Sequence, residues 1–290
     1  MRELVAAQFP NWADLPVQRV EHDGHDNRTF RLGTDMAVRL PSHPRYAAQV
    51  RKEQEWLPQL APLLPLEIPI PIAVGRPTAR YQLPWSVYRW LEGEDAAHAR
   101  VRDPTGFAMS LAEFLNALQA VDLDAGPMPG EHNFFRGGPL TIYDDETRRA
   151  IATLRGHIDV DAVTAVWDEA LRSTWETDPV WIHGDVAASN LLVRGGSLAA
   201  VIDFGCSGVG DPACDLAIAW TFFAEESRTS FRNELQLDES TWARARGWAI
   251  WKGLITLVDT AGADTPEAVR AQRLIEVVIV DHRMTGNPDG

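Results

Sequence analysis

The stretch WIHGDVAASNLLVRGGSLAAVIDFG, residues 181–205, sets polar side chains between short apolar runs. The runs VWI at 180–182 and LLV at 191–193 are typical of short buried strands. A third apolar run follows Gly195–Gly196, and a glycine pair is a favoured two-residue turn between the strands of a β-hairpin. The stretch therefore predicts a polar loop that leads directly into a hairpin.

The register of this hairpin brings two oxygen-bearing side chains together. If the glycine pair forms the turn, Arg194 faces Ser197 and Asn190 faces Val201. Asp203 lies two residues beyond Val201, so its side chain shares a face with that of Asn190. Diagonal neighbours of this kind are roughly 7–8 Å apart, which is close enough for them to share one cation.

One carboxylate and one amide oxygen form a ligand pair that suits Mg²⁺, because this ion keeps several waters and shares the phosphate oxygens of a substrate. The loop before the hairpin carries Asp185, whose carboxylate could accept a proton from an incoming hydroxyl. A metal pair beside a proton acceptor is the set of parts that phosphoryl transfer requires.

The ordered motifs HGDVAASN and IDFG, residues 183–190 and 202–205, resemble the catalytic signature of the aminoglycoside phosphotransferases. The resemblance implies a protein-kinase-like α+β fold, with a small antiparallel-sheet N-terminal lobe that carries one helix and a larger, mainly helical C-terminal lobe. It also implies that Asp185 is the catalytic base and that Asn190 and Asp203 are Mg²⁺ ligands.

The resemblance continues through GVGDPACDLA, residues 208–217. Asp211 before Pro212 is a typical helix N-cap followed by proline at the first helical position. The family places an aspartate in this run that braces the catalytic loop, and Asp215 is the candidate. We expect His183 to anchor the same loop rather than to titrate in the reaction.

A loop over the nucleotide phosphates is expected before the first long strands. Gly24 and Asn27, in DGHDNRTF at 23–30, fit the loose family pattern, and an ordinary tight turn is an equally good interpretation. The sequence holds no Walker-type G-x-x-x-x-G-K-[ST] motif. Arg39 in MAVRLP, residues 36–41, occupies the position of the phosphate-pairing lysine of kinases, and a guanidinium can also contact phosphate oxygens.

A helix is predicted over residues 45–57, ending before Pro58. Its apolar stripe consists of Tyr46, Val50, Glu53 and Leu57. A carboxylate on such a stripe needs a partner, and Arg39 is the proposed partner of Glu53. Glu55 is the competing choice, and a solvated glutamate at the surface is the remaining alternative.

The stretch SVYRWLEGE, residues 86–94, falls where the lobes should join. The resemblance implies that the adenine edge pairs with backbone groups around Arg89, Trp90 and Leu91. We therefore predict a nucleotide-binding lobe with its hinge in residues 1–93, and a catalytic and acceptor-binding lobe in residues 94–290.

Composition and charge narrow the class of protein. Of the 290 residues, 45% are hydrophobic and 23% charged, as in ordinary globular proteins. The two cysteines suggest a reducing compartment, and neither a signal peptide nor an apolar run of membrane-spanning length is evident, which predicts a cytoplasmic protein. Residues 1–93 hold 11 Lys+Arg and 10 Asp+Glu, whereas residues 94–290 hold 16 and 31, a net charge of −15. This acidity disfavours nucleic acid and anionic membranes and attracts cations, unless it serves solubility alone.

These features predict an ATP- or GTP-dependent, Mg²⁺-dependent kinase of a small-molecule hydroxyl, with an aminoglycoside-type cation as the expected acceptor. A protein substrate is disfavoured because Gly184 stands where protein kinases carry the arginine of H-R-D, and because only five residues separate Gly205 from Asp211. Macrolides, homoserine, choline or fructosamines are alternative acceptors, and a catalytically silent binding module is the alternative of another class. Nothing in the sequence indicates an oligomeric state.

Overall fold

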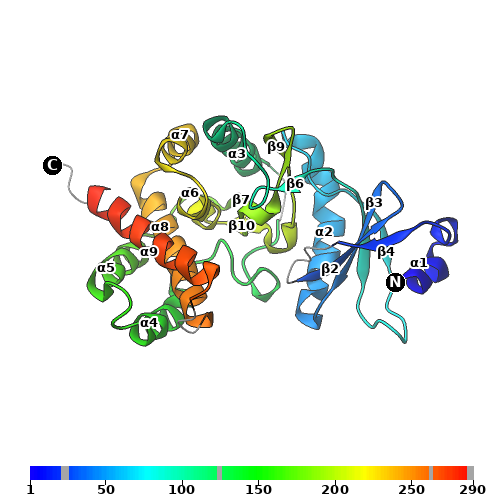
Figure 1. The fold of residues 1–290 in the computed structure, drawn as a ribbon, viewed down its shortest axis with the longest axis horizontal. Coiled ribbons are helices and arrows are strands. Elements are labelled where there is room, and N and C mark those ends of the chain that lie inside the picture. Colours follow the sequence, from blue (N-terminus) through cyan, green and yellow to red (C-terminus); the bar gives the residue numbers. More distant parts are fainter. Residues whose placement is uncertain (21–25, 123–125, 261–263, 286–290) are drawn as a thin grey trace.

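The computed structural model describes residues 1–20, 26–122, 126–260 and 264–285. Figure 1 shows a small lobe of strands and two helices beside a larger assembly of helices. We call the elements from α1 to β5 the small lobe and the remaining elements the large lobe. The α+β architecture predicted from the sequence is confirmed, but the small lobe carries two helices, α1 and α2, where one was expected. Within the described ranges, none of the helices is both long and apolar enough to span a membrane.

The small lobe is built on a five-stranded antiparallel sheet with the order β1-β2-β3-β5-β4. Its strands are β1 Val17–Arg19, β2 Asn27–Leu32, β3 Met36–Pro41, β4 Pro71–Gly75 and β5 Trp85–Arg89. Strands β2 and β3 are joined by a tight turn at Gly33, whose φ of +63° is readily adopted by glycine.

The two faces of this sheet have different tasks. Val38 and Leu40 point to one face, where they form a small core with Trp85 and with Val5 of α1, Arg2–Gln8. Because side chains alternate along a strand, Arg39 between them points to the other face, which carries α2. The alternation of side chains along β3 thus points Arg39 away from the small core and toward α2.

Helix α2, Ala47–Leu60, is longer than the sequence predicts. The expected end before Pro58 is wrong, because Pro58 lies inside the helix and the helix continues to Leu60. A proline in a last turn removes one backbone hydrogen bond. Leu57 and Leu60, which are 1% and 0% exposed, pack on either side of it into the main core, so tertiary packing holds the final turn.

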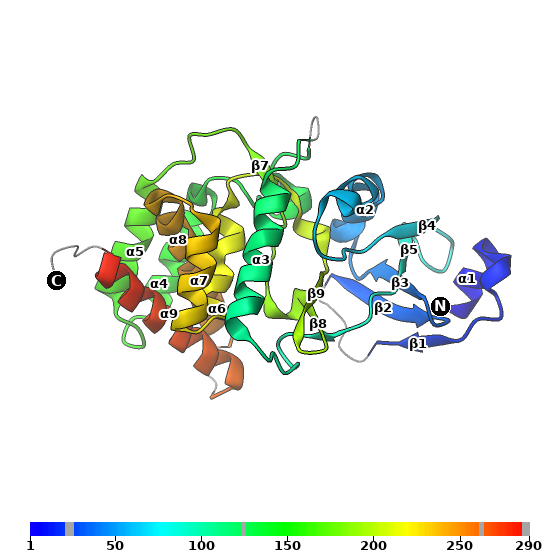
Figure 2. The same ribbon diagram turned by 90° about the horizontal axis from the view of Figure 1, so that it is seen from above.

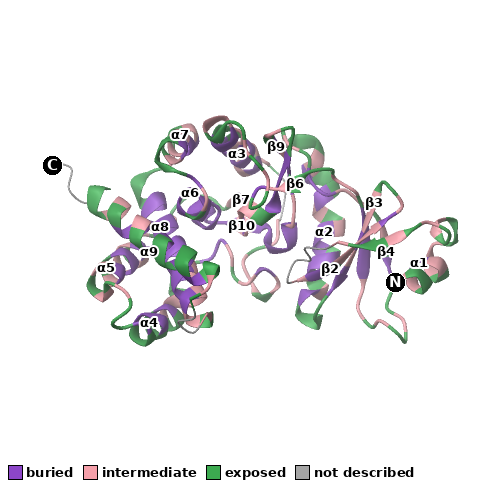
Figure 3. Ribbon diagram, viewed as in Figure 1, coloured by how far each residue is buried: buried purple, intermediate pink, exposed green. Residues whose placement is uncertain are grey.

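The large lobe consists of helices around α8. Their bounds are α3 Pro104–Gln119, α4 Asp144–Thr153, α5 Val160–Arg172, α6 Ile218–Thr221, α7 Glu225–Leu235, α8 Glu239–Asp259 and α9 Pro266–Thr285. Helix α8 packs against α4, α5 and α9, and the buried residues gather where these helices face one another (Figure 3). Helix α8 is buried around most of its circumference. A helix in such a position has no distinct polar face.

The large lobe also contains short strands. They are β6 Glu94–Asp95, β7 Val180–Ile182, β8 Leu191–Arg194, β9 Ser197–Val201 and β10 Gly208–Gly210. Strand β6 pairs with β8, β8 with β9, and β7 with β10. The β8–β9 hairpin lies beside α3 (Figure 2). The chain leaves the small-lobe sheet at Arg89 and pairs with β8 from Glu94 onward. The domain boundary predicted after residue 93 lies in this interval and stays a prediction.

A buried ion pair joins α8 to the segment before α6. Arg244 Nε donates to Asp211 at 2.7 Å, and the two side chains are 4% and 8% exposed. Asp211 also caps the 3-10 helix Pro212–Ala217 by accepting the Ala213 N–H at 3.1 Å, which confirms the predicted N-cap. Burial raises the pKa of Asp211, although Arg244 acts in the opposite direction.

Replacing Arg244 with Met should lower the free energy of unfolding by about 3–5 kcal/mol, because Asp211 would keep its buried site without a partner. Arg148→Met is the matched control: Arg148 pairs with Asp144 and Asp168 at an exposed surface, and its loss should cost under about 1 kcal/mol. Urea unfolding followed by circular dichroism measures both. Equal losses in the two variants would contradict the structural role of the buried pair.

Candidate active site

The loop between β7 and β8 begins at a fully buried histidine. His183 Nε2 donates to the Ile202 carbonyl at 3.0 Å, and its ring meets that of Phe204 with centroids 4.6 Å apart. His183 therefore ties the start of the loop to the residues on either side of Asp203. A histidine held in this way joins two segments of the backbone.

Gly184 is required by the backbone at the next position. Its φ is +83°, and a Cβ there would lie 2.3 Å from the Cys206 carbonyl oxygen. Any other residue would be strained and would also push the segment after Asp203 away from the loop. The close approach of these two segments therefore depends on Gly184.

Asp215 supports the same loop from within the large lobe. Its carboxylate accepts the backbone N–H of His183 at 2.8 Å and that of Gly184 at 2.7 Å, and the residue is 1% exposed. Burial raises the pKa of Asp215, whereas His183 and the two N–H donors work against the rise. These two hydrogen bonds are the contacts that a brace of the loop needs.

Asp185 is half-buried and is oriented by Asn190. Asn190 Nδ2 donates to the Asp185 carbonyl at 2.9 Å and lies 3.3 Å from the Asp185 carboxylate. The amide oxygen of Asn190 makes no hydrogen bond within the described part of the chain. One side chain thus fixes the proposed base and still offers an oxygen to a further ligand.

The hairpin that follows has a different register from the one predicted. The pairing of Asn190 with Val201 is wrong: Leu191 faces Val201, and the Ile202 N–H donates to the Asn190 carbonyl at 2.8 Å. The cause is a β-bulge that leaves Ala199 unpaired between the strands and moves every later partner by one residue.

A segment outside the hairpin stabilises this bulge. The Glu67 backbone accepts the Val201 N–H at 2.9 Å and donates to the Ala199 carbonyl at 3.3 Å. Pairing with Glu67 therefore satisfies backbone groups that the bulge would leave free. A signal for this contact is absent from the hairpin's own sequence.

Asp203 leaves the strand in a left-handed conformation, with φ +68° and ψ +62°. This conformation is uncommon for a residue other than glycine, and it redirects the side chain after the pairing has ended. The Asp203 carboxylate accepts from Arg39 Nη2 at 2.5 Å. Burial acts to raise the pKa of Asp203, but the charge and the hydrogen bond of Arg39 outweigh it and hold the pKa below its ordinary value.

Arg39 reaches a second carboxylate on α2. Its Nη1 lies 3.3 Å from Glu53, which also accepts a hydrogen bond from the Tyr88 hydroxyl. Glu53 is 5% exposed, whereas Glu55 is exposed, so the interpretation of Glu53 as a solvated surface residue is wrong. The predicted partner lies in contact with Arg39, and the contact with Asp203 was not foreseen.

Lys52 is a residue that the sequence reasoning missed. Its Nζ donates to the carbonyls of Gly205 and Ser207, each at 2.7 Å, and the residue is 8% exposed. Burial lowers the pKa of Lys52 to about 8. The available signal was composition, because Lys52 and Lys252 are the only lysines in a chain of 27 Lys+Arg. Lys52 ties α2 to the segment directly after Asp203.

A third carboxylate adds to the negative charge of the site. Asp26 accepts from Gln49 Nε2 at 3.3 Å. Burial raises the pKa of Asp26, and the charges of Asp203 and Asp185 raise it further. Carboxylates that repel one another in this way favour the arrival of a cation between them.

The donor set fits a magnesium ion that is shared with a substrate. Among the described residues there is no group of three or more His, Cys, Asp or Glu side chains that could enclose a metal. Mg²⁺ prefers few protein ligands and fills its shell with water and phosphate oxygens. The Asp203 carboxylate, which is 27% exposed, and the free oxygen of Asn190 match that requirement.

The two residues proposed for the phosphate loop are less informative. Gly24 lies outside the described residues. Asn27 is the first residue of β2, where it is 7% exposed and faces Pro41 of β3. The structure therefore places Asn27 at the base of the predicted loop.

The three hinge residues differ in what their backbones can offer. The Arg89 N–H donates to the Ile70 carbonyl at 2.9 Å, and the Trp90 N–H donates to the Asp35 carbonyl at 2.7 Å. Only the Leu91 N–H lacks a backbone acceptor within the described part of the chain. Of the three, Leu91 is thus the one whose N–H remains for an external base.

The comparisons with known proteins concern the family and the fold. The model of the phosphotransferase enzyme family matches residues 17–248. No curated protein matches the sequence. The structure of the GDP complex of aminoglycoside 2'-phosphotransferase-IIIa is similar, with a TM-score of 0.73, 19% identity and 97% of each chain covered.

Two further solved structures share the fold. The streptomycin–ATP–APH(2")-IIa ternary complex has a TM-score of 0.59 at 17% identity, with 94% of each chain covered. The macrolide 2'-phosphotransferase MphH from Brachybacterium faecium has a TM-score of 0.62 at 20% identity, with 95% of this chain and 98% of that chain covered. At such identities the likeness concerns the fold.

Lys52→Met tests the contact between α2 and the carbonyls of Gly205 and Ser207, through the pH dependence of the free energy of unfolding. The folded pKa of about 8 lies below the ordinary 10.5, so burial of the charged amine costs stability below pH 8. That cost disappears as the pH rises from 8 to 10.5, and the wild type should gain up to about 3 kcal/mol relative to the variant over this window. Urea unfolding of both proteins at pH 7 and pH 10, without nucleotide or metal, measures the gain. A difference that does not change with pH would contradict the buried setting of Lys52.

Proposed function

Because this chain belongs to the phosphotransferase enzyme family and is an O-phosphotransferase, we propose that it transfers the γ-phosphoryl group of ATP or GTP to a hydroxyl of an aminoglycoside-type cationic acceptor. The observation that carries the proposal is the linkage of Asp185, Asn190 and Asp203. Asn190 bonds to Asp185 through its side chain and to the residue before Asp203 through its backbone.

Asp185 is proposed as the catalytic base. Its carboxylate is partly accessible, and Asn190 restricts its orientation. In that role it accepts the proton of the acceptor hydroxyl or aligns the hydroxyl for attack. His183 and Asp215 act indirectly, because their hydrogen bonds hold the loop that carries Asp185.

Asn190 and Asp203 are proposed as the protein ligands of Mg²⁺. When bound, the ion would neutralise charge on the transferring phosphates. Arg39 is held on one side by Glu53, and its other amino group is at Asp203. We expect this guanidinium to steady the nucleotide phosphates next to the metal, since arginine can contact two oxygens at once.

The nucleotide base is proposed to bind at the hinge through the Leu91 N–H, with Arg89 and Trp90 shaping the linker. Asn27 and Gly24 would belong to the loop over the phosphates. Support for a nucleoside triphosphate donor comes from two of the similar structures, a GDP complex and a ternary complex that contains ATP. Both ATP and GTP remain candidates.

The choice of acceptor rests on two observations. The net charge of −15 over residues 94–290 favours a polycation by long-range attraction. The similar structures include aminoglycoside complexes with kanamycin, streptomycin and gentamicin. A macrolide acceptor is the second candidate, because two macrolide phosphotransferases match the fold with TM-scores of 0.62.

Asp185→Ala should lower the turnover of phosphoryl transfer by about 100-fold or more, because the variant lacks the group that accepts the proton. Nucleotide affinity should change little, since the proposed nucleotide contacts lie elsewhere. A coupled ADP assay and fluorescence titration with nucleotide measure the two quantities. Asp145→Ala, which removes an exposed aspartate of α4, is the control and should leave both unchanged. An unchanged rate in Asp185→Ala removes the base assignment.

A panel of acceptors tests the substrate class. Kanamycin, a macrolide, choline, homoserine and a fructosamine are each incubated with Mg²⁺ and either ATP or GTP, and the products are weighed by mass spectrometry. We expect a gain of one phosphate on the aminoglycoside, with a rate that falls as salt increases, because charge attraction is screened. Phosphorylation of neutral acceptors alone would contradict the cationic acceptor and leave the phosphotransferase reaction intact. Nucleotide binding without any product would favour the silent binding module.

A further inference from the structure

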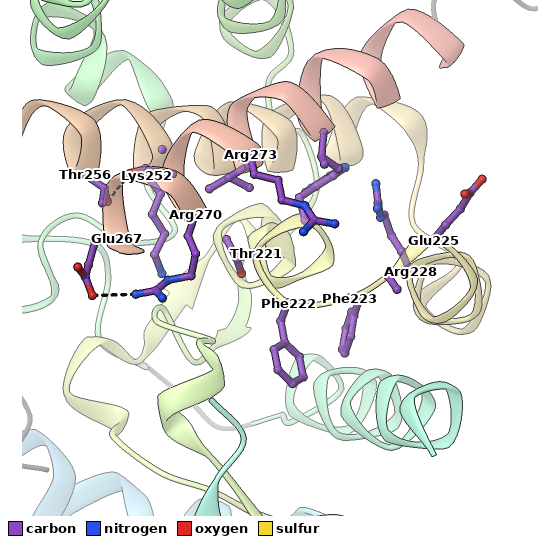
Figure 4. Close-up of a pocket in the computed structure, with 16 residues that line it drawn as sticks. Thr221, Phe222, Phe223, Glu225, Arg228, Lys252, Thr256, Glu267, Arg270 and Arg273 are labelled. Atoms are coloured by element: carbon purple, nitrogen blue, oxygen red, sulfur yellow. Dashed lines mark hydrogen bonds and ion pairs between the residues drawn. The ribbon is translucent and has the colours of Figure 1, made fainter. Parts of the chain in front are cut away.

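A cavity of about 710 Å³ lies among helices α6 to α9 of the large lobe (Figure 4). Residues from the end of α6 and the start of α7 form one side, and residues of α8 and α9 form the other. Asp185, Asn190 and Asp203 do not line it. The cavity is therefore a feature separate from the phosphoryl-transfer groups.

The charged side chains around this cavity are mostly cations. Four are basic and two are acidic, in a lobe where Asp+Glu outnumber Lys+Arg by 31 to 16. The basic residues are Arg228, Lys252, Arg270 and Arg273, and the acidic residues are Glu225 and Glu267. The cavity thus carries a charge opposite to that of the lobe that contains it.

Two of the four cations have no acidic partner. Arg270 pairs with Glu267 at 2.8 Å. Within the ranges that the structure describes, Lys252 and Arg273 form neither an ion pair nor a side-chain hydrogen bond. Figure 4 shows the side chains of Lys252, Arg270 and Arg273 extending from the α8 and α9 side of the cavity. Their charge is available to a ligand.

Arg228 is only loosely compensated. Its guanidinium lies 3.8 Å from Asp281, which also pairs with Arg246 at 3.4 Å. The Nε of Arg228 is buried and has no hydrogen-bond acceptor within the described part of the chain. Because this Nε is closed off from solvent, a ligand in the cavity could not reach it, and Arg228 contributes positive charge to the cavity rather than this donor.

The rest of the lining is largely apolar. Its apolar residues on α8 and α9 are Gly253, Ala271, Leu274 and Val277, beside the polar Thr256, and α6 contributes Trp220. Sites for small molecules combine an apolar wall with a few polar groups that fix orientation. A free inorganic ion would use the cations and leave this wall uncovered, whereas an organic anion would use both.

From the two unpaired cations and the apolar wall of the cavity, we propose that it binds a small organic oxyanion, a carboxylate or phosphate ester attached to an apolar body, at a site separate from the site of phosphoryl transfer. The same charge excludes the cationic acceptor of the proposed function, because like charges would have to be brought together. The proposal does not depend on which acceptor the enzyme phosphorylates.

Three probes of similar size and different charge test the ligand class: phenyl phosphate, benzoate and benzylamine, each titrated by isothermal calorimetry. We expect both anions to bind and benzylamine not to bind. The double variant Lys252→Gln/Arg273→Gln should weaken the anions about tenfold, since two attractive charges are removed. Arg149→Gln is the matched control, because it removes an exposed arginine of α4 without an ion pair among the described residues, and its affinities should equal those of the wild type.

Two further readouts separate this site from the active site. Saturation with ADP should leave the affinity for phenyl phosphate unchanged, and the double variant should keep the wild-type rate of phosphoryl transfer. Competition between ADP and phenyl phosphate would place the anion in the nucleotide site and overturn the proposal. Equal binding by the wild type and the double variant, or binding of benzylamine as tight as that of the anions, would overturn it as well.

Discussion

The site depends on one guanidinium that binds two carboxylates. Arg39 of β3 contacts Glu53 of α2 at 3.3 Å and Asp203 after β9 at 2.5 Å. The two contacts join α2 of the small lobe and the segment after β9 of the large lobe to one side chain of the small-lobe sheet. A lysine carries a single point charge, whereas the planar fork of arginine presents separate donors to two partners. The departure from the usual kinase lysine is therefore suited to a three-part junction.

Negative charge is what this junction has to control. The charges of Asp203 and Asp185 add to burial in raising the pKa of Asp26, whereas Arg39 holds the pKa of Asp203 below its ordinary value. The large lobe is acidic as a whole, but the cavity among α6 to α9 is lined mainly by cations. Ligands of opposite charge would therefore bind at different places on this lobe.

Features that depend on neighbouring residues could be predicted from the sequence, whereas contacts between residues distant in the sequence could not. The strands that frame the catalytic loop, the glycine turn and the Asp211 cap follow from local patterns, and the structure has them. The hairpin register failed because Glu67, more than 100 residues earlier, pairs with the bulge. The contacts of Lys52 escaped for the same reason, since a buried lysine is recognised by carbonyls that only the fold brings to it.

Neighbouring positions on α2 have a mechanical consequence. Glu53 holds Arg39, and Lys52 holds the backbone beyond Asp203, yet consecutive helical residues point about 100° apart. A roll of α2 about its own axis by a few tens of degrees would pull both side chains off their partners at once. The rotation of this single helix would then set the position of Arg39 and the position of the backbone after Asp203. Both contacts would form or break together.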